Sequence, residues 1–453
     1  MQNKRKINSS GDQGLFDMDI IEECKRIDKK LNCFTAIADK IDRKIVFSIK
    51  DCICTKGMLS SAGSRILQNY IPVFDATIVE KIKTVGSIIG KTCQDEFGFG
   101  TFCKNTYKIP KNPWDLERSC GGSSGGAACL TAALDYPHIA IGESTGGSIS
   151  CPAAFCGVIG LTPTYGLVSR YGLIDYANSL DKIGVIARSV KECAFGLTVI
   201  SGYDSKDSTN LNLKQQDYTR FLEENKLKIG IPREYFNNID EKINEKVWNA
   251  IKILEKIGFE YEEVSLAYTK YALAAYYLIA MSEASTNLAK YCGLRYGLSS
   301  NPQEKGFNEY FSEIRSKGFG DEAKRRIILG TYARMAGYRD EFYLKAMKIR
   351  TLVINDFKKA FKKVDVLVSP TMPILPPKIS DVINLDPIKE YQCDVLTVPI
   401  NLAGMPHISV PCGFVNSLPI GLHIMGDHIQ ESKIIQLAYA YEKERGEIKY
   451  PKV

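Results

Sequence analysis

Two short clusters of glycine and serine constrain this sequence more than any other feature. The first reads CGGSSGGAACL (120–130) and the second reads IGESTGGSISCPAAFCG (141–157). A helix-like segment and the strand-like run HIAIGE (138–143) lie between the two serine-bearing loops. Glycines beside a strand or a helix let the backbone turn tightly and leave N–H groups bare. Such N–H groups bind a phosphate or stabilise an oxyanion equally well.

A nucleotide-binding interpretation is the weaker of the two. Neither cluster reads GxxxxGK[ST], and GxGxxG is absent from both. A glycine-rich turn without function remains an alternative for either cluster taken alone. Two clusters with serines inside them favour a serine nucleophile supported by backbone N–H groups.

A serine hydroxyl needs a base before it can attack a carbonyl carbon. No histidine stands in a motif that would present it to a serine; the four are His138, His407, His423 and His428. Lysine is the remaining candidate, as in the Ser-Lys variant of the catalytic triad. Lys50 follows the apolar run KIVFSI (44–49). It can accept a proton only when it is uncharged, which burial or nearby positive charge favours. A solvated lysine is the alternative.

Apolar, β-branched runs alternate with helical stretches along the chain, which predicts an α/β fold. The predicted strands cover residues 44–49, 138–143, 228–232, 364–369, 407–412 and 419–425. A helix is predicted over 241–258, with an apolar face of Ile243, Val247, Ile251 and Leu254. Near the end of the chain the same spacing recurs at Ile434, Leu437, Ala438 and Tyr441.

The polar stretch 203–218 is the one segment that could divide the chain. Strand-like runs occur on both sides of it, so we expect one domain over residues 1–453 with a surface loop there. The basic opening, residues 1–14, has no apolar run behind it and is not a secretory signal. We expect a cytoplasmic protein without a membrane span. The alternative is that the basic opening segment targets the protein to an organelle.

Charge and cysteine usage exclude several classes of function. The net charge of +7 is spread along the chain, which does not indicate a protein that binds nucleic acid by itself. The 14 cysteines form no CxxC pair, and no histidine lies at metal-site spacing from them. We therefore expect reduced thiols that serve as small core residues, and no metal site.

The motifs SIKD (48–51), GGSSGG (121–126), TGGSIS (145–150) and GLTPTYG (160–166) resemble the amidase signature hydrolases. The resemblance implies an α/β/α fold with a large mixed β-sheet flanked by helices. It also implies a Ser–cis-Ser–Lys triad with Ser148 as nucleophile, Ser123 as the bridging serine after a cis peptide, and Lys50 as base. The oxyanion hole would come from the N–H groups of Thr145, Gly146 and Gly147.

Longer stretches resemble the glutaminase A subunits of the tRNA-dependent amidotransferases; they are 168–184, 282–297, 323–346 and 394–413. The resemblance implies that this chain releases ammonia from glutamine. Two partners, a tRNA-binding kinase (the B subunit) and a small C subunit, would use it to amidate Glu-tRNA(Gln) or Asp-tRNA(Asn). ATP and Mg²⁺ would act on the partner, and this chain needs no cofactor.

By motif position, Arg326 would hold the α-carboxylate of glutamine and Asp394 its α-ammonium, with Tyr276 or Tyr277 lining the same site. One arginine and one aspartate match the two charges of a free amino acid. Without the resemblance, Arg326 would be part of a solvated basic helix face, and Asp394 would be a turn residue.

The chain departs from the signature at four positions. Ser150 stands in place of the usual arginine after GGSI, Ser144 replaces the acid before TGGS, Cys120 replaces a proline, and Thr162 replaces a lysine. Two alternatives to the glutaminase therefore stay open. One is a stand-alone amidase that acts on a small or aromatic carboxamide, and the other is an inactive scaffold protein that only holds partners.

Overall fold

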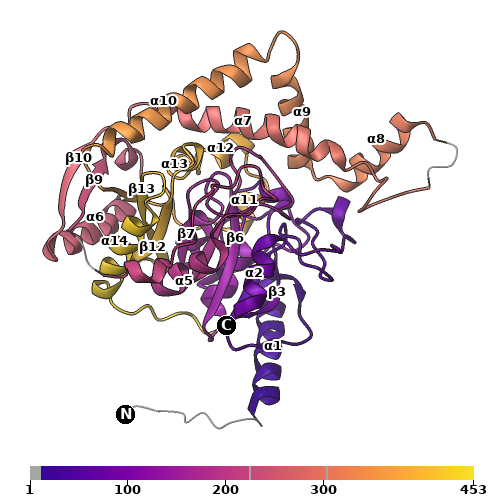
Figure 1. Cartoon of the computed structure of the whole chain (residues 1–453). Coiled ribbons are helices and arrows are strands. Elements are labelled where there is room, and N and C mark those ends of the chain that lie inside the picture. Colours follow the sequence, from indigo (N-terminus) through magenta and orange to yellow (C-terminus); the bar gives the residue numbers. More distant parts are fainter. Residues whose placement is uncertain (1–11, 224–225, 302–304) are drawn as a thin grey trace.

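A mixed sheet of 11 strands runs through the centre of the fold (Figure 1). The structure is a computed structural model, and it describes residues 12–223, 226–301 and 305–453. Most of the basic opening segment, residues 1–11, therefore lies outside the described residues. A separate two-stranded ribbon is formed by β4 (Lys111–Asn112) and β5 (Asp115–Ser119).

The strands of the large sheet follow the spatial order β1-β3-β2-β6-β8-β7-β12-β13-β11-β9-β10. Their bounds are β1 (Phe34–Ile37), β2 (Val46–Lys50), β3 (Ser87–Thr92), β6 (His138–Ser144), β7 (Ile159–Thr162), β8 (Lys182–Ala187), β9 (Lys228–Pro232), β10 (Glu260–Val264), β11 (Val366–Pro370), β12 (His407–Val415) and β13 (Leu418–Gly426). Parallel and antiparallel pairs occur together: β2 is parallel to β3 and β6, whereas β6 is antiparallel to β8.

The α-helices are α1 (Asp12–Leu31), α2 (Thr77–Val85), α3 (Gly125–Ala133), α4 (Ser150–Cys156), α5 (Val190–Ile200), α6 (Glu241–Lys256), α7 (Ala272–Asn287), α8 (Phe307–Gly318), α9 (Asp321–Arg334), α10 (Lys345–Ala360), α11 (Ile379–Ile383), α12 (Pro387–Gln392), α13 (Val398–Leu402) and α14 (Glu431–Glu444). Figure 1 shows α7, α9 and α10 together along one side of the molecule, away from α1.

The predicted strands are confirmed as β2, β6, β9, β11, β12 and β13, with ends that differ by three residues or fewer. The helix predicted over 241–258 is α6, which ends at Lys256. Its N-cap Asp240 accepts a hydrogen bond from the Lys242 N–H at 2.8 Å, which satisfies one of the free donors of the first turn. The expected apolar faces of α6 and α14 are buried.

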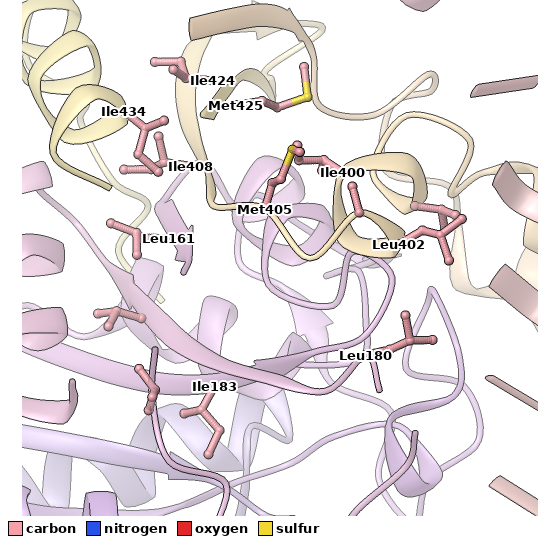
Figure 2. Close-up of a cluster of buried hydrophobic side chains, with 14 of the residues drawn as sticks. Leu161, Leu180, Ile183, Ile400, Leu402, Met405, Ile408, Ile424, Met425 and Ile434 are labelled. Atoms are coloured by element: carbon pink, nitrogen blue, oxygen red, sulfur yellow. The ribbon is translucent and has the colours of Figure 1, made fainter. Parts of the chain in front are cut away.

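Alternate residues of β6 face two different helix layers, as a period of two requires. Ile139 and Ile141 join the buried cluster that includes residues of α2 and α5, whereas Ala140 joins the cluster that includes α1 and α3. Figure 2 shows part of the larger cluster, where Ile408 of β12 and Ile424 of β13 lie near Ile434 of α14. These two layers of helices on the sheet confirm the α/β/α fold.

The polar stretch 203–218 does not interrupt the sheet. β7 precedes this stretch and β12 follows it, yet the two strands pair directly, with Leu161 opposite Ile408. The stretch itself contains no strand or α-helix. Among the described helices, none is both long enough and apolar enough to cross a bilayer.

Candidate active site

Two neighbouring parallel strands bring the first site residues together. β2 ends at Lys50, and β6, its parallel neighbour, ends at Glu143 and Ser144. The carboxyl ends of parallel strands lie at the same edge of a sheet, where ligands bind in open α/β sheets. The glycine–serine loop that follows β6 begins at this edge.

Lys50 is completely buried, so its interpretation as a solvated strand-end lysine is wrong. Its Nζ donates to the Ser123 Oγ at 2.7 Å and to the Glu143 carbonyl oxygen at 2.9 Å. It also forms a hydrogen-bonded ion pair with the Glu143 Oε2 at 2.8 Å. The structure thus joins the predicted base to the predicted bridging serine.

Both serines stand at the start of a helix. Ser123 follows a cis peptide bond from Gly122, as the resemblance implied, and α3 begins two residues later. Ser148 precedes α4 and is buried, and its carbonyl oxygen accepts a hydrogen bond from the Ser124 N–H at 3.1 Å. Among the hydrogen bonds between described residues, none joins the hydroxyls of Ser123 and Ser148. Such contacts often tighten only when substrate binds, and the role of Ser148 stays a prediction.

The predicted oxyanion loop is packed too closely for any residue except glycine at two positions. A Cβ on Gly146 would meet the Tyr276 Cζ and Oη at 2.6 Å, and a Cβ on Gly147 would meet the Thr397 Oγ1. The Thr145 hydroxyl shares a hydrogen bond of 2.9 Å with the Tyr276 hydroxyl. The Gly147 N–H donates to the Ser144 Oγ at 3.2 Å. Tyr276 therefore lines this loop, and its role in substrate binding stays a prediction.

Arg326 of α9 is 1% exposed, which rules out a solvated position for this residue. Its Nε donates to the Glu322 Oε1 at 2.7 Å, and its Nη2 donates to the Phe99 carbonyl oxygen at 2.9 Å. A further hydrogen bond joins its Nη1 to the Tyr176 hydroxyl. The guanidinium carbon also lies 5.3 Å from the centre of the Tyr277 ring. A guanidinium has five N–H donors, so two remain for a ligand.

Asp394 is also buried and contacts Tyr277. Its Oδ2 accepts hydrogen bonds from the Tyr277 hydroxyl at 2.9 Å and from the Thr101 hydroxyl at 2.8 Å. Burial raises the pKa of the Asp394 carboxyl to about 7, although these hydrogen bonds and the Arg326 charge oppose that change. The fold thus places Arg326 and Asp394 around one tyrosine. An amino acid bound there would lie beside the positively charged guanidinium of Arg326 and the titratable carboxyl of Asp394.

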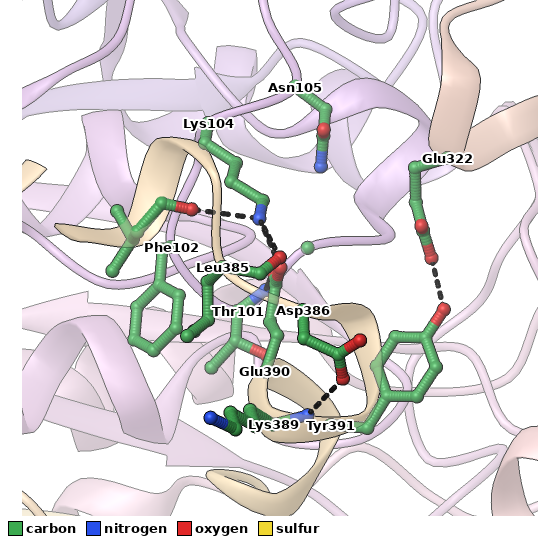
Figure 3. A network of polar contacts seen from close by, with 12 residues as sticks. Thr101, Phe102, Lys104, Asn105, Glu322, Leu385, Asp386, Lys389, Glu390 and Tyr391 are labelled. Atoms are coloured by element: carbon green, nitrogen blue, oxygen red, sulfur yellow. Dashed lines mark hydrogen bonds and ion pairs between the residues drawn. The ribbon is translucent and has the colours of Figure 1, made fainter. Parts of the chain in front are cut away.

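A polar network holds this region in place, as Figure 3 shows. The Tyr391 hydroxyl donates to the Glu322 Oε1 at 2.6 Å, so Glu322 connects α12 with Arg326. Lys104 forms an ion pair of 2.8 Å with Glu390, whose other oxygen accepts the Thr101 N–H at 3.1 Å. Both contacts fix α12, which directly precedes Asp394.

Two buried histidines lie beside Ser150, where the signature has an arginine. The Ser150 Oγ is 3.1 Å from the His407 Nδ1, and that nitrogen is 2.9 Å from the His423 Nε2. Burial, with the Lys182 charge, lowers the pKa of His407 well below its usual range and that of His423 to about 3. Both imidazoles are therefore neutral near pH 7. The first residue of α4 therefore lacks the positive charge that the signature carries there.

Sequence reasoning missed several residues that contact this site: Phe99, Thr101, Tyr176, Glu322, Tyr391 and Thr397. Glu143 was included only as the end of the strand-like run 138–143, and Tyr277 only as an alternative to Tyr276. Both tyrosines prove to contact predicted site residues. A glutamate that ends a strand next to the TGGS motif was the one local signal available for Glu143.

The sheet, the two glycine–serine loops and the buried lysine together are typical of amide-hydrolysing enzymes. A sequence model of the Amidase family matches residues 21–435. The chain therefore belongs to the amidase family.

Within this family, the chain is similar to proteins named as the A subunit of glutamyl-tRNA(Gln) amidotransferase. It is 50% identical over 422 residues to the protein of Halothermothrix orenii, a match that covers 92% of this chain and 88% of the relative. It is 51% identical over 403 residues to the protein of Methanosarcina barkeri, covering 88% and 84%. A crystal structure of the Thermotoga maritima protein has a TM-score of 0.83 at 37% identity, covering 96% of this chain and 94% of that one.

Proposed function

We propose that this chain is the glutamine-hydrolysing subunit of a tRNA-dependent amidotransferase. The observation that carries the proposal is the buried Lys50, whose Nζ donates to the Ser123 Oγ at 2.7 Å beside the TGGS loop. The Arg326 and Asp394 pair supports a substrate with both α-charges, which is a free amino acid.

In the proposed reaction, the Ser148 Oγ attacks the side-chain amide carbon of glutamine. Its proton passes to Ser123, whose own proton passes to Lys50. The N–H groups of Thr145, Gly146 and Gly147 stabilise the oxyanion, which is usually a large contribution in acyl transfer. This step requires the Gly147 N–H to exchange its hydrogen bond with the Ser144 Oγ for one with the oxyanion. When the C–N bond breaks, the proton returns to the leaving nitrogen, which departs as ammonia. Water then hydrolyses the glutamyl ester and releases glutamate.

The names of the similar proteins support a multisubunit enzyme. We propose that a tRNA-binding kinase (the B subunit) and a small C subunit receive the ammonia and amidate Glu-tRNA(Gln) or Asp-tRNA(Asn) in the cytoplasm. ATP and Mg²⁺ act on the partner in this proposal, and this chain uses no metal or organic cofactor. Its contact with tRNA is mainly indirect.

Ammonia release from glutamine tests the proposal. The full chain, alone and co-expressed with its partner subunits, is assayed against glutamine and against a neutral carboxamide. Low activity alone that rises in the complex, with glutamine preferred, is the expected result. Equal turnover with and without partners, or a preference for the neutral amide, would favour a stand-alone amidase. Assembly without any glutaminase activity would favour an inactive scaffold protein.

A further inference from the structure

We propose that Glu143 is a fourth member of the proton relay. It takes up a proton from Lys50, so that Lys50 can accept the proton that Ser123 delivers. This inference rests on the proposed serine mechanism. It gives a function to a residue for which the resemblance implies none.

The contacts of Lys50 are those of an ammonium group. Its Nζ has three acceptors, namely the Ser123 Oγ, the Glu143 carbonyl oxygen and the Glu143 Oε2, at 2.7, 2.9 and 2.8 Å. A lysine ammonium has three N–H donors and no lone pair. When all three are donated, Nζ cannot accept the proton of Ser123. A lone pair becomes available once one proton moves from Nζ to the Glu143 Oε2.

Burial favours this route over the loss of a proton to solvent. The side chains of Lys50 and Glu143 are 0% and 4% exposed. Among the ion pairs between described residues, Lys50 is the only partner of Glu143. Removing the Lys50 proton to water would leave a buried carboxylate without a cation, which is strongly unfavourable. Moving the same proton to Oε2 keeps the pair neutral throughout.

The second carboxyl oxygen of Glu143 points to the same conclusion. The Oε1 atom is buried and has no hydrogen-bond partner among the described residues. A carboxylate oxygen without a donor destabilises the charged form of the acid relative to the protonated form. The proton that Oε2 takes up would thus lie on a carboxyl group whose other oxygen is not engaged by any described donor.

Two other titratable groups interact electrostatically with this pair. Asp181 directly precedes β8, and burial together with the Glu143 charge raises the pKa of its carboxyl well above its usual range. Burial also raises the pKa of the Cys52 thiol well above its usual range. The Cys52 thiol is therefore uncharged near pH 7, and the Asp181 carboxyl, which accepts the Tyr176 and Ala177 N–H groups at 3.0 Å, interacts with the charge of Glu143.

The step proceeds as follows in atoms. One Nζ proton of Lys50 moves to the Glu143 Oε2, and the amine turns about its Cε–Nζ bond until the lone pair faces Ser123. The amine accepts the Ser123 proton while Ser123 takes the proton of Ser148, whose Oγ forms the bond to the amide carbon. When the C–N bond breaks, the proton returns through Ser123 to the leaving nitrogen. Glu143 then gives its proton back to Lys50.

The pH dependence of Ser148 reactivity tests this relay. The full-length wild type and Glu143→Gln are treated with a fluorophosphonate probe, which labels serine nucleophiles, between about pH 5 and 9. The wild-type site is active as a neutral pair and should keep its reactivity at low pH. In Glu143→Gln, Ser148 is reactive only in molecules whose Lys50 has lost its proton to solvent. The acidic limb of its pH profile is the pH range over which the labelling rate falls as the pH is lowered. This limb should therefore move to higher pH by about one unit or more, and each unit corresponds to a tenfold loss of labelling rate at a given low pH.

Two further variants serve as controls, and each folded state is checked by thermal melting. Glu143→Asp keeps a carboxylate and should have a limb between those of the wild type and Glu143→Gln. Glu431→Gln changes another buried glutamate, which accepts the Thr164 N–H at 2.8 Å, and should leave the limb in place.

An unchanged limb in Glu143→Gln would show that Glu143 only braces Lys50. A limb that moves to lower pH would show that Glu143 merely holds Lys50 charged. Either result overturns the relay. Labelling does not require glutamine, so the two proposals can fail separately. A wild type that is labelled but does not hydrolyse glutamine would refute the glutaminase function, and the pH profiles of labelling would still test the relay. A wild type that is not labelled at Ser148 would overturn both.

Discussion

The Tyr277 hydroxyl donates a hydrogen bond of 2.9 Å to the Asp394 Oδ2, while the ring of the same tyrosine lies 5.3 Å from the Arg326 guanidinium carbon. Tyr277 thus contacts both a buried cation and a buried acid. Residues from α7, α9 and the turn after α12 meet at this point. The predictions below concern this pair and the serines and lysine beside it.

Lys50→Arg should be almost inactive on glutamine. An arginine side chain stays protonated at any working pH, so it cannot accept the Ser123 proton. The kcat for ammonia release measures the loss. Lys91 is also fully buried, and its Nζ donates to the Ser60 Oγ at 3.0 Å, outside the serine relay. Lys91→Arg is therefore the matched control and should retain more activity. Substantial turnover by Lys50→Arg would contradict a lysine base.

Ser148→Ala should abolish glutaminase activity, and Ser123→Ala should lower it more than Ser124→Ala. Ser124 donates its hydroxyl to the Glu143 carbonyl oxygen at 3.1 Å, and no hydrogen bond among the described residues joins it to Lys50, whereas Ser123 accepts from the Lys50 Nζ. Peptide mapping after treatment with a reactive glutamine analogue locates the nucleophile. A label on Ser124 or on a cysteine would show that the assignment of Ser148 is wrong.

Arg326→Ala and Asp394→Ala should each weaken the use of glutamine by roughly 10- to 150-fold. Each side chain supplies a charge-assisted hydrogen bond, worth about 1.5–3 kcal/mol. The loss should appear in kcat/KM for glutamine and hardly at all for a neutral carboxamide. Arg325 shares Glu322 with Arg326, so the exposed Lys324 is the cleaner control for Ala substitution. Equal losses on both substrates would indicate that the pair only supports the fold.

The KM for glutamine should depend on pH through Asp394. Burial raises the pKa of this carboxyl to about 7, so the group is mostly neutral at pH 6 and mostly ionised at pH 8. Only the ionised form can pair with an α-ammonium, and KM should therefore fall by about tenfold as pH rises over this range. Asp394→Asn should remove this dependence of KM. A wild-type KM that does not change with pH would contradict the assignment of the α-ammonium site.

Gly146→Ala should cost about 100-fold or more in kcat while the protein still melts cooperatively. The added methyl group would meet the Tyr276 ring at 2.6 Å, so the loop that presents the oxyanion donors must move. Loss of one such donor typically costs 10²–10³ in kcat. Gly306→Ala is the control, because its Cβ position has no atom within 4 Å. Full activity in Gly146→Ala would exclude this loop as the oxyanion hole.

Among the strands that the sequence predicted, β2 and β11 are apolar runs that contain no glycine. Three interior strands of the sheet were not predicted, β3, β7 and β8, and each has a glycine in its interior. A Cβ on Gly90 would meet the Ala36 carbonyl oxygen at 2.5 Å, and one on Gly184 would meet the Leu161 carbonyl oxygen. These glycines permit close approach of a neighbouring strand. In the sequence alone, these glycines interrupt the apolar pattern that predicts a strand.

Lys50 and Ser123, which the structure brings together, each lie in a short motif with its own local pattern, whereas the role of Ser148 stays a prediction. The partners of Arg326 could not be predicted, since Phe99 and Tyr176 are 227 and 150 positions away from it. The position of Glu143 against Lys50, 93 positions apart, likewise depends on strand pairing. Such contacts follow from the tertiary fold, and no local pattern in the sequence records them.

The pairing of β7 with β12 has a consequence for the synthesis of the protein. Residues 159–162 leave the ribosome long before residues 407–415, and until then one edge of β7 has no strand to bind. Until β12 has been synthesised, the free edge of β7 is prone to pair with strands of other chains. Asp394 is also translated late, so a nascent chain holds the lysine and both serines before it can bind an amino acid. A chaperone that covers this edge during translation would protect the growing chain from aggregation.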